Sequence, residues 1–127
     1  MTGRAIGMLS LRLDAAYCLI LGAGVAFTAP FLATVLSLPV AAVAVAGGAV
    51  ILWAGVVLWM SIRLPLRLAL RAVMIANSVA TCAIAGLSAA AAGVFAVLAI
   101  LAIAADVALF AGSQAIALRR LQMAPAP

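Results

Sequence analysis

The sequence contains no histidine, lysine or glutamate, and its 127 residues include only two acids, Asp14 and Asp106. Without histidine, a haem, copper or zinc site is difficult to build. Without lysine, no Schiff base can form with retinal or pyridoxal phosphate. Acid–base catalysis near neutral pH usually needs histidine, or a tuned glutamate or lysine. We therefore expect a chain that is not an enzyme and that holds no metal and no cofactor.

Charged residues of every kind are scarce, at 7% of the chain, whereas 71% of the residues are apolar. Soluble domains are about half apolar and about a quarter charged. Since roughly 20 apolar residues cross a bilayer, a chain of this length has room for about four crossings and little else. The composition predicts an all-α membrane protein that forms a single domain over residues 1–127.

Prolines and arginines divide the apolar sequence into four predicted transmembrane helices. They cover about residues 13–29, 40–62, 68–88 and 94–118. Residues 30–39 are bracketed by prolines and too few to span, so they form a short interfacial segment or the kinked end of the first helix. Short connections predict an up-down-up-down bundle. The first span also resembles a signal peptide with a cleavage site near Gly24, but we expect the segment to be retained.

All seven basic residues are arginines, and their placement predicts the orientation. They precede the first span, separate the second from the third and follow the fourth, whereas the other two connections are uncharged. The positive-inside rule then places both termini in the cytoplasm. The six arginines expected to set topology and to contact anionic lipid headgroups are Arg12, Arg63, Arg67, Arg71, Arg119 and Arg120. The net charge of +5 is thus explained without nucleic acid as a partner.

Asp106 falls near the middle of the fourth span, where a charge is costly and often functional. Asn77 and Thr81 lie one turn apart on the third span and are its expected partners. With Gln114, these residues are the predicted intramembrane polar network, with Asp106 pointing into the bundle. The network either fixes helix register, handles a proton or polar ligand, or contacts another subunit.

Asp14 is expected at the cytoplasmic mouth of the first span, where it would complement the helix dipole and pair with nearby arginines. Gln114 is near enough to that boundary to bond to Asp14 or to backbone. Tyr17 and Trp59 are expected in a cytoplasmic aromatic belt.

Small residues recur in the spans and predict a tightly packed bundle. Examples are Gly47 and Gly48 in the second span and Gly112 in the fourth. Cys18 and Cys82 are expected at different depths, as small buried side chains without a disulfide.

Several short motifs resemble an uncharacterised family of small bacterial four-span integral membrane proteins. They are Leu11-Arg12-Leu13-Asp14-Ala15, Leu38-Pro39, Asn77, Phe110, Gln114 and Leu118-Arg119-Arg120. Ala80 and Ala117 depart from the pattern, where an aromatic residue and a glycine are usual. The resemblance implies the fold, the topology and a bacterial inner membrane, but no activity.

These observations favour a non-catalytic accessory subunit that associates with another membrane protein or complex. The alternative is an oligomeric transporter or channel for a small solute or ion, with Asp106, Asn77 and Thr81 as its polar lining. A second alternative is a lipid-binding or hydrophobic-ligand-binding protein. The expected partners are the lipid bilayer and other membrane subunits or a second copy of the chain.

Overall fold

The computed structural model describes residues 2–91 and 93–123, and its regular elements are all helical. The elements are α1 (Gly3–Phe27), α2 (Ala29–Leu36), α3 (Val40–Arg63), α4 (Leu66–Leu87), a 3-10 turn η1 (Ser88–Ala90) and α5 (Val94–Met123). Four of them, α1, α3, α4 and α5, are long and apolar enough to cross a membrane. The predicted all-α class and the four long apolar helices are confirmed.

Local sequence explains where the helices begin. The hydroxyl of Thr2 accepts a hydrogen bond from the Ala5 amide at 3.3 Å and caps α1. Pro39 and Pro65 immediately precede α3 and α4. Proline has no backbone N–H to donate, but at the start of a helix that N–H would have no intrahelical acceptor, so no hydrogen bond is lost. Helix α1 begins ten residues before the predicted span, because the amphipathic turns around Arg4 continue the helix beyond its most apolar part.

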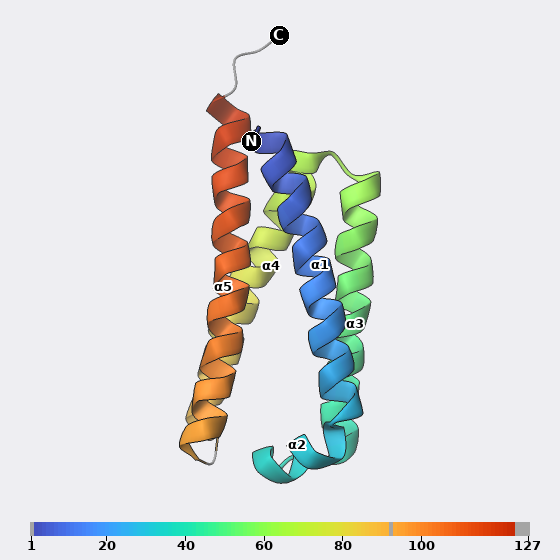
Figure 1. The fold of residues 1–127 in the computed structure, drawn as a ribbon, viewed down its shortest axis with the longest axis vertical. Helices are drawn as coiled ribbons and strands as arrows, with labels where there is room; N and C mark the ends of the chain where they lie inside the picture. The colour runs from blue at the N-terminus through green and yellow to red at the C-terminus, as the bar shows by residue number, and fades with distance from the viewer. Residues whose placement is uncertain (1, 92, 124–127) are drawn as a thin grey trace.

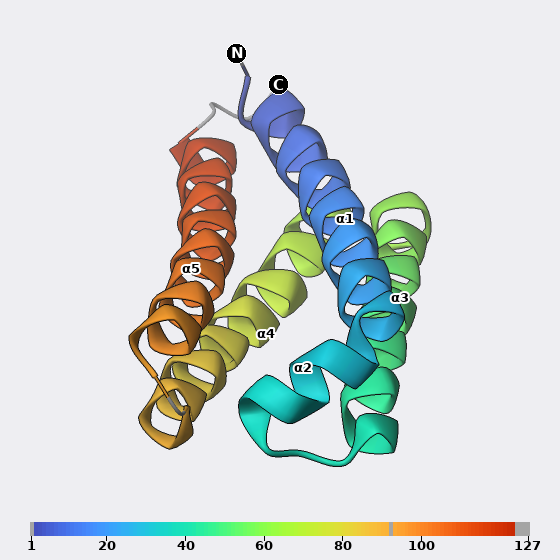
Figure 2. The same cartoon turned by 60° about the horizontal axis from the view of Figure 1, so that its bottom comes forward.

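The segment predicted at residues 30–39 is the separate short helix α2. Thr28 breaks the helical dihedrals after α1, and Ser37 ends α2 in the left-handed region at φ 54°. Ala29 and Ala33 are buried against Val43 of α3. Figures 1 and 2 show α2 lying across the end of the molecule opposite the start of α1.

Successive long helices run in opposite directions, so the start of α1 lies beside the end of α5 (Figure 1). The contacts between α1 and α5 recur every seven residues on both helices. Gly3 meets Arg120, the hydroxyls of Ser10 and Ser113 lie 2.6 Å apart, and Tyr17 reaches Asp106. A seven-residue repeat is the spacing of a coiled-coil seam, so this pair packs in one continuous register.

Helices α1 and α3 pack most closely at two glycines. A methyl group placed on Gly22 would lie 2.7 Å from the carbonyl oxygen of Gly47, and one placed on Gly47 would lie 2.7 Å from the amide nitrogen of Ala26. The backbones are therefore closer than any larger residue permits. Gly48 and Gly112, also candidates for close packing, have nothing within 4 Å of such a methyl group.

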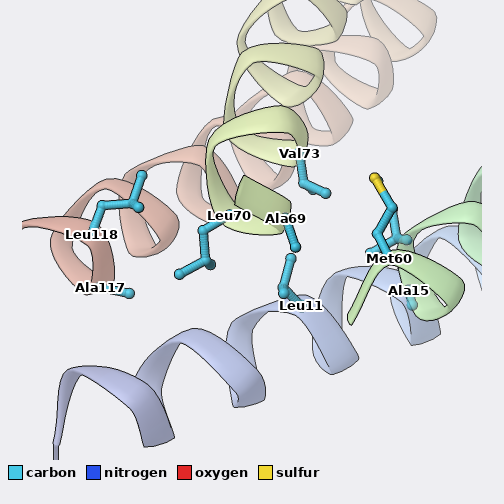
Figure 3. Close-up of a cluster of buried hydrophobic side chains, with 9 residues drawn as sticks. Leu11, Ala15, Met60, Ala69, Leu70, Val73, Ala117 and Leu118 are labelled. Carbon is cyan, nitrogen blue, oxygen red and sulfur yellow. The ribbon is translucent and has the colours of Figure 1, made fainter. Parts of the chain in front are cut away.

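The helices form two pairs, α1 with α3 and α4 with α5, which diverge toward the end covered by α2 (Figure 2). At the opposite end all four long helices contribute to one apolar core (Figure 3). Its buried members are Leu11, Ala15, Val57, Met60, Ala69, Leu70, Val73, Ala117 and Leu118. We call the half of the molecule with this core the closed half and the half beside α2 the splayed half.

Candidate functional site

A cluster of polar side chains lies one helical turn beyond the apolar core. Asp14 follows Leu11 on α1, Asn77 follows Val73 on α4, and Gln114 precedes Leu118 on α5 by about a turn. All three polar side chains are buried, with exposures of 1%, 3% and 0%. The polar cluster therefore separates the closed half from the splayed half.

Asp14 is the centre of this polar cluster. Its Oδ2 accepts hydrogen bonds from Asn77 Nδ2 at 2.6 Å and from Gln114 Nε2 at 2.9 Å. Its Oδ1 accepts a longer contact from Cys18 Sγ at 3.6 Å. Asn77 Nδ2 also approaches Gln114 Oε1 at 3.5 Å. All three donors converge on one carboxyl group, and the hydrogen bonds from Asn77 and Gln114 join α1 to α4 and α5.

The predicted place of Asp14 at a helix end is wrong, because α1 starts at Gly3 and puts Asp14 in its interior. Of the two partners expected for Gln114, Asp14 or backbone, the structure shows Asp14. Asn77 also lies in a polar network as predicted, but its carboxylate partner comes from α1. The sequence did carry a signal that Asp14 faces inward. Asp14 follows the apolar Leu11 by about one helical turn and precedes Cys18 by four residues, so the three side chains share one face of the helix.

The predicted place of Asp106 in the bundle interior is also wrong. Its side chain is exposed on the outer surface of α5, and Tyr17 Oη donates to its Oδ2 at 2.9 Å. The Tyr17 ring packs on Phe110 with ring centres 5.4 Å apart. Tyr17 therefore serves as a hydrogen-bond partner for the Asp106 carboxylate. The structure separates Asp106 from Asn77 and Thr81.

Thr81 does not contribute its hydroxyl to a carboxylate. It donates instead to the backbone carbonyl of Asn77 at 2.8 Å, one turn earlier on the same helix. Cys82 is exposed whereas Cys18 is buried, so only one of the two cysteines fits the expected buried role.

Asp106 and Tyr17 lie in a groove between α1 and α5, which we call the outer groove. The groove has a volume of about 440 Å³ and is mostly apolar. Its lining residues are Ile6, Leu9, Ser10, Leu13, Tyr17, Asp106, Leu109, Phe110 and Ser113. Because Ser113 donates to the carbonyl of Phe110, the Ser10 hydroxyl is the donor in the serine pair on the groove floor.

A separate cavity lies in the splayed half, among α1, α3, α4 and α5. It has a volume of about 320 Å³, and Asn77 forms part of its wall. A smaller cavity of about 200 Å³ near the end of α2 shares Ile84 with it. The closed half thus ends at the polar cluster, and the apolar cavities begin there.

The arginines expected to meet lipid headgroups are all exposed. Arg12 lies nine residues after the start of α1, and the other five lie toward the end of α3, the start of α4 and the end of α5, which Figure 1 shows at one end of the molecule. Arg67 also donates to the backbone carbonyl of Leu121 at 2.7 Å, which joins α4 to the end of α5.

Comparisons with protein families, with curated proteins and with solved structures find no match to this chain. The resemblance to a bacterial four-span family stays a prediction, and the function has to be argued from the geometry alone.

Proposed function

We propose that this protein is a non-catalytic subunit of a larger assembly in a bacterial plasma membrane, and that its outer groove docks a transmembrane helix of another protein. The observation that carries the proposal is the position of Asp106. Its carboxylate is exposed on the apolar outer surface near the middle of α5, where Tyr17 donates to one of its two oxygens.

The physical argument starts from the cost of that carboxylate. An aspartate at the centre of a membrane helix costs about 2.5–3.5 kcal/mol on insertion scales. The one neutral phenol offsets about 1.5–3 kcal/mol of this, as a hydrogen bond to a charged group does, and it reaches only Oδ2 of the carboxylate. A donor on a neighbouring helix would satisfy the remaining acceptor positions and remove the carboxylate from lipid.

The chemistry of the groove indicates which partner fits. The walls are apolar and the floor carries a small serine pair, so a helix can approach closely. The partner helix needs an arginine, lysine or amide donor at the depth of Asp106. A second copy fits less well, because a symmetric pair would bring two Asp106 carboxylates to the same depth. Arg12 of a second copy would not supply the donor at that depth. It lies about 7–8 Å further along α1 than Tyr17, at a rise of about 1.5 Å per residue.

The arginine distribution supports an orientation with both termini in the cytoplasm. The arginine-bearing helix ends gather at one end of the molecule, and the positive-inside rule assigns that end to the cytoplasm. The end with α2 then faces the other side, with α2 near the membrane interface.

The transporter alternative receives less support from the geometry. It requires Asp106, Asn77 and Thr81 on one polar path, whereas Asp106 is bonded to Tyr17, away from Asn77, and the Thr81 hydroxyl is used by the backbone carbonyl of Asn77. The polar cluster around Asp14 is also filled by its own donors.

Site-specific photo-crosslinking in native membranes tests the docking proposal. A photoreactive residue replaces Leu109 in the groove, and the control replaces Leu52 on α3. The two positions are matched, with exposures of 72% and 74%. We expect a discrete crosslink to a second protein from position 109 and only lipid adducts from position 52. The crosslink should disappear in Asp106→Leu and weaken in Asp106→Asn, which keeps one acceptor oxygen.

Identification of the crosslinked peptide completes the test. We expect it to come from a transmembrane segment with an arginine, lysine or amide side chain, and replacement of that donor by leucine should remove the crosslink. No crosslink at position 109, a crosslink only to a second copy, or one that persists unchanged in Asp106→Leu would each refute the proposal.

A further inference from the structure

The cavity in the splayed half shares only Tyr17 with the lining of the outer groove, and the inference drawn from it does not rest on the docking proposal. Its walls come from four helices and are mostly apolar, and its lining residues include Leu21, Val50, Trp53, Ala80 and Ile84. Ligand sites in proteins are typically about 300–1,000 Å³, so a cavity of about 320 Å³ lies at the small end of that range. An engineered apolar cavity of about 150 Å³ holds one benzene, which sets the capacity here at roughly a dozen non-hydrogen atoms.

One polar atom distinguishes this cavity from a simple packing defect. Asn77 uses its amide nitrogen to donate to Asp14 and Gln114. Its carbonyl oxygen Oδ1 has no hydrogen-bond partner among residues 2–91 and 93–123. Among these residues, every side-chain oxygen or nitrogen that lacks a hydrogen-bond partner has some accessible surface, so Asn77 Oδ1 is accessible too. Since Asn77 is 3% exposed and lines the cavity, its Oδ1 faces that cavity.

The acceptors around Asn77 hold that oxygen in place. Asp14 and Gln114 fix the amide nitrogen on the side of the polar cluster, so the carbonyl must point the other way. Other polar groups on the wall are already engaged, because Cys18 donates to Asp14 and Tyr17 donates to Asp106. A water molecule is held well only by two to four polar partners, which this wall does not supply.

We propose that the cavity binds a single-chain amphiphile of roughly a dozen non-hydrogen atoms, whose terminal hydroxyl donates to Asn77 Oδ1. The hydroxyl lies at the polar cluster and the chain runs along the apolar walls toward Ile84. The smaller cavity, lined by Leu36 and Leu38 near the end of α2, shares Ile84 with this cavity. A longer chain would extend into it.

Trp53 provides a direct measurement, because its ring lines the cavity. The other tryptophan, Trp59, is exposed and is replaced in Trp59→Phe to leave one reporter. The probe is 10-bromo-1-decanol, whose bromine quenches nearby tryptophan, added to the full-length protein in lipid vesicles. The matched probe is its methyl ether, which has the same chain but no hydroxyl donor.

We expect saturable quenching of Trp53 by the alcohol, with the ether about threefold to tenfold weaker because it lacks one hydrogen bond. Ala80→Phe places a ring inside the cavity and should abolish the saturable component. Ala83→Phe is the control, since Ala83 is on the same helix but exposed on its outer surface. Ala49→Phe fills the cavity from α3 and replaces Ala80→Phe if that variant does not fold.

Three results would overturn the proposal. Quenching that rises linearly with the probe-to-lipid ratio would show collisions from bulk lipid only. Equal saturable quenching in the Ala80→Phe and Ala83→Phe variants would place the probe elsewhere. Equal affinity for the alcohol and the ether would remove the role of Asn77 Oδ1.

Discussion

The close contact between α1 and α3 predicts a large stability difference between two neighbouring glycines. The perturbation is Gly22→Ala, with Gly24→Ala as its matched control on the same helix. The added methyl group at Gly22 would lie 2.7 Å from the Gly47 carbonyl oxygen and 2.9 Å from the Ile51 amide nitrogen, whereas the same group at Gly24 meets nothing within 4 Å. The two variants add the same atoms, so only the contact differs.

The magnitude follows from what the methyl group meets. Ordinary contact begins at 3.4 Å, so the helices must separate by several tenths of an ångström. The obstructing atoms are backbone and cannot rotate away. Overpacking of this kind costs about 1–3 kcal/mol. Gly24→Ala should be neutral or stabilising by up to about 1 kcal/mol, because alanine is the better helix former.

Equilibrium unfolding in mixed micelles, followed by circular dichroism, gives the free energies of unfolding. Gly47→Ala and Gly48→Ala provide a second matched pair on α3, where only Gly47 meets α1. The double variant Gly22→Ala with Gly47→Ala should lose less free energy of unfolding than the sum of the two single variants. The separation of α1 and α3 that one methyl group forces also makes room for the other. Equal stabilities for Gly22→Ala and Gly24→Ala would refute the proposed close packing of α1 on α3.

Three further outcomes are expected. Asp14→Ala should lower the free energy of unfolding by at least about 1–3 kcal/mol in the same micelle assay, because it leaves buried amide donors without an acceptor; a loss no larger than that of Ala16→Gly, an exposed site on the same helix, would contradict this. A lipid-soluble maleimide should label Cys82 and spare Cys18, giving one adduct per chain by mass spectrometry, and two adducts in the folded protein would contradict the burial of Cys18. A reporter fused after Pro127 should read as cytoplasmic, and a periplasmic signal would contradict the proposed orientation.

The sequence was sufficient to predict the helical class and four long apolar helices, because prolines and arginines divide long apolar stretches. It was not sufficient to predict which face of each helix points inward. Helix α5 is apolar nearly all round, so no amphipathic stripe indicates its rotation. The buried face contains Ala104, Val107 and Gln114, and this leaves Asp106 outside.

The same limit applies to the polar cluster and the close helix contact. Asn77 and Gln114 were expected in a polar network, but their partner was assigned to the wrong aspartate, since depth alone does not indicate rotation. The sequence has ten glycines that look alike, and only the three-dimensional arrangement shows that Gly22 meets Gly47 while Gly48 meets nothing.

The hydrogen bonds that link α1 to α4 and α5 affect how the protein is made. Helix α1 leaves the ribosome before α4 and α5, yet Asp14 on α1 depends on Gln114 on α5 and Asn77 on α4. Until those helices are inserted, α1 has to carry its aspartate without either amide donor. The newly made chain should therefore stay near the insertion machinery until α5 arrives, and a chain arrested before α5 should be an early substrate for membrane quality control.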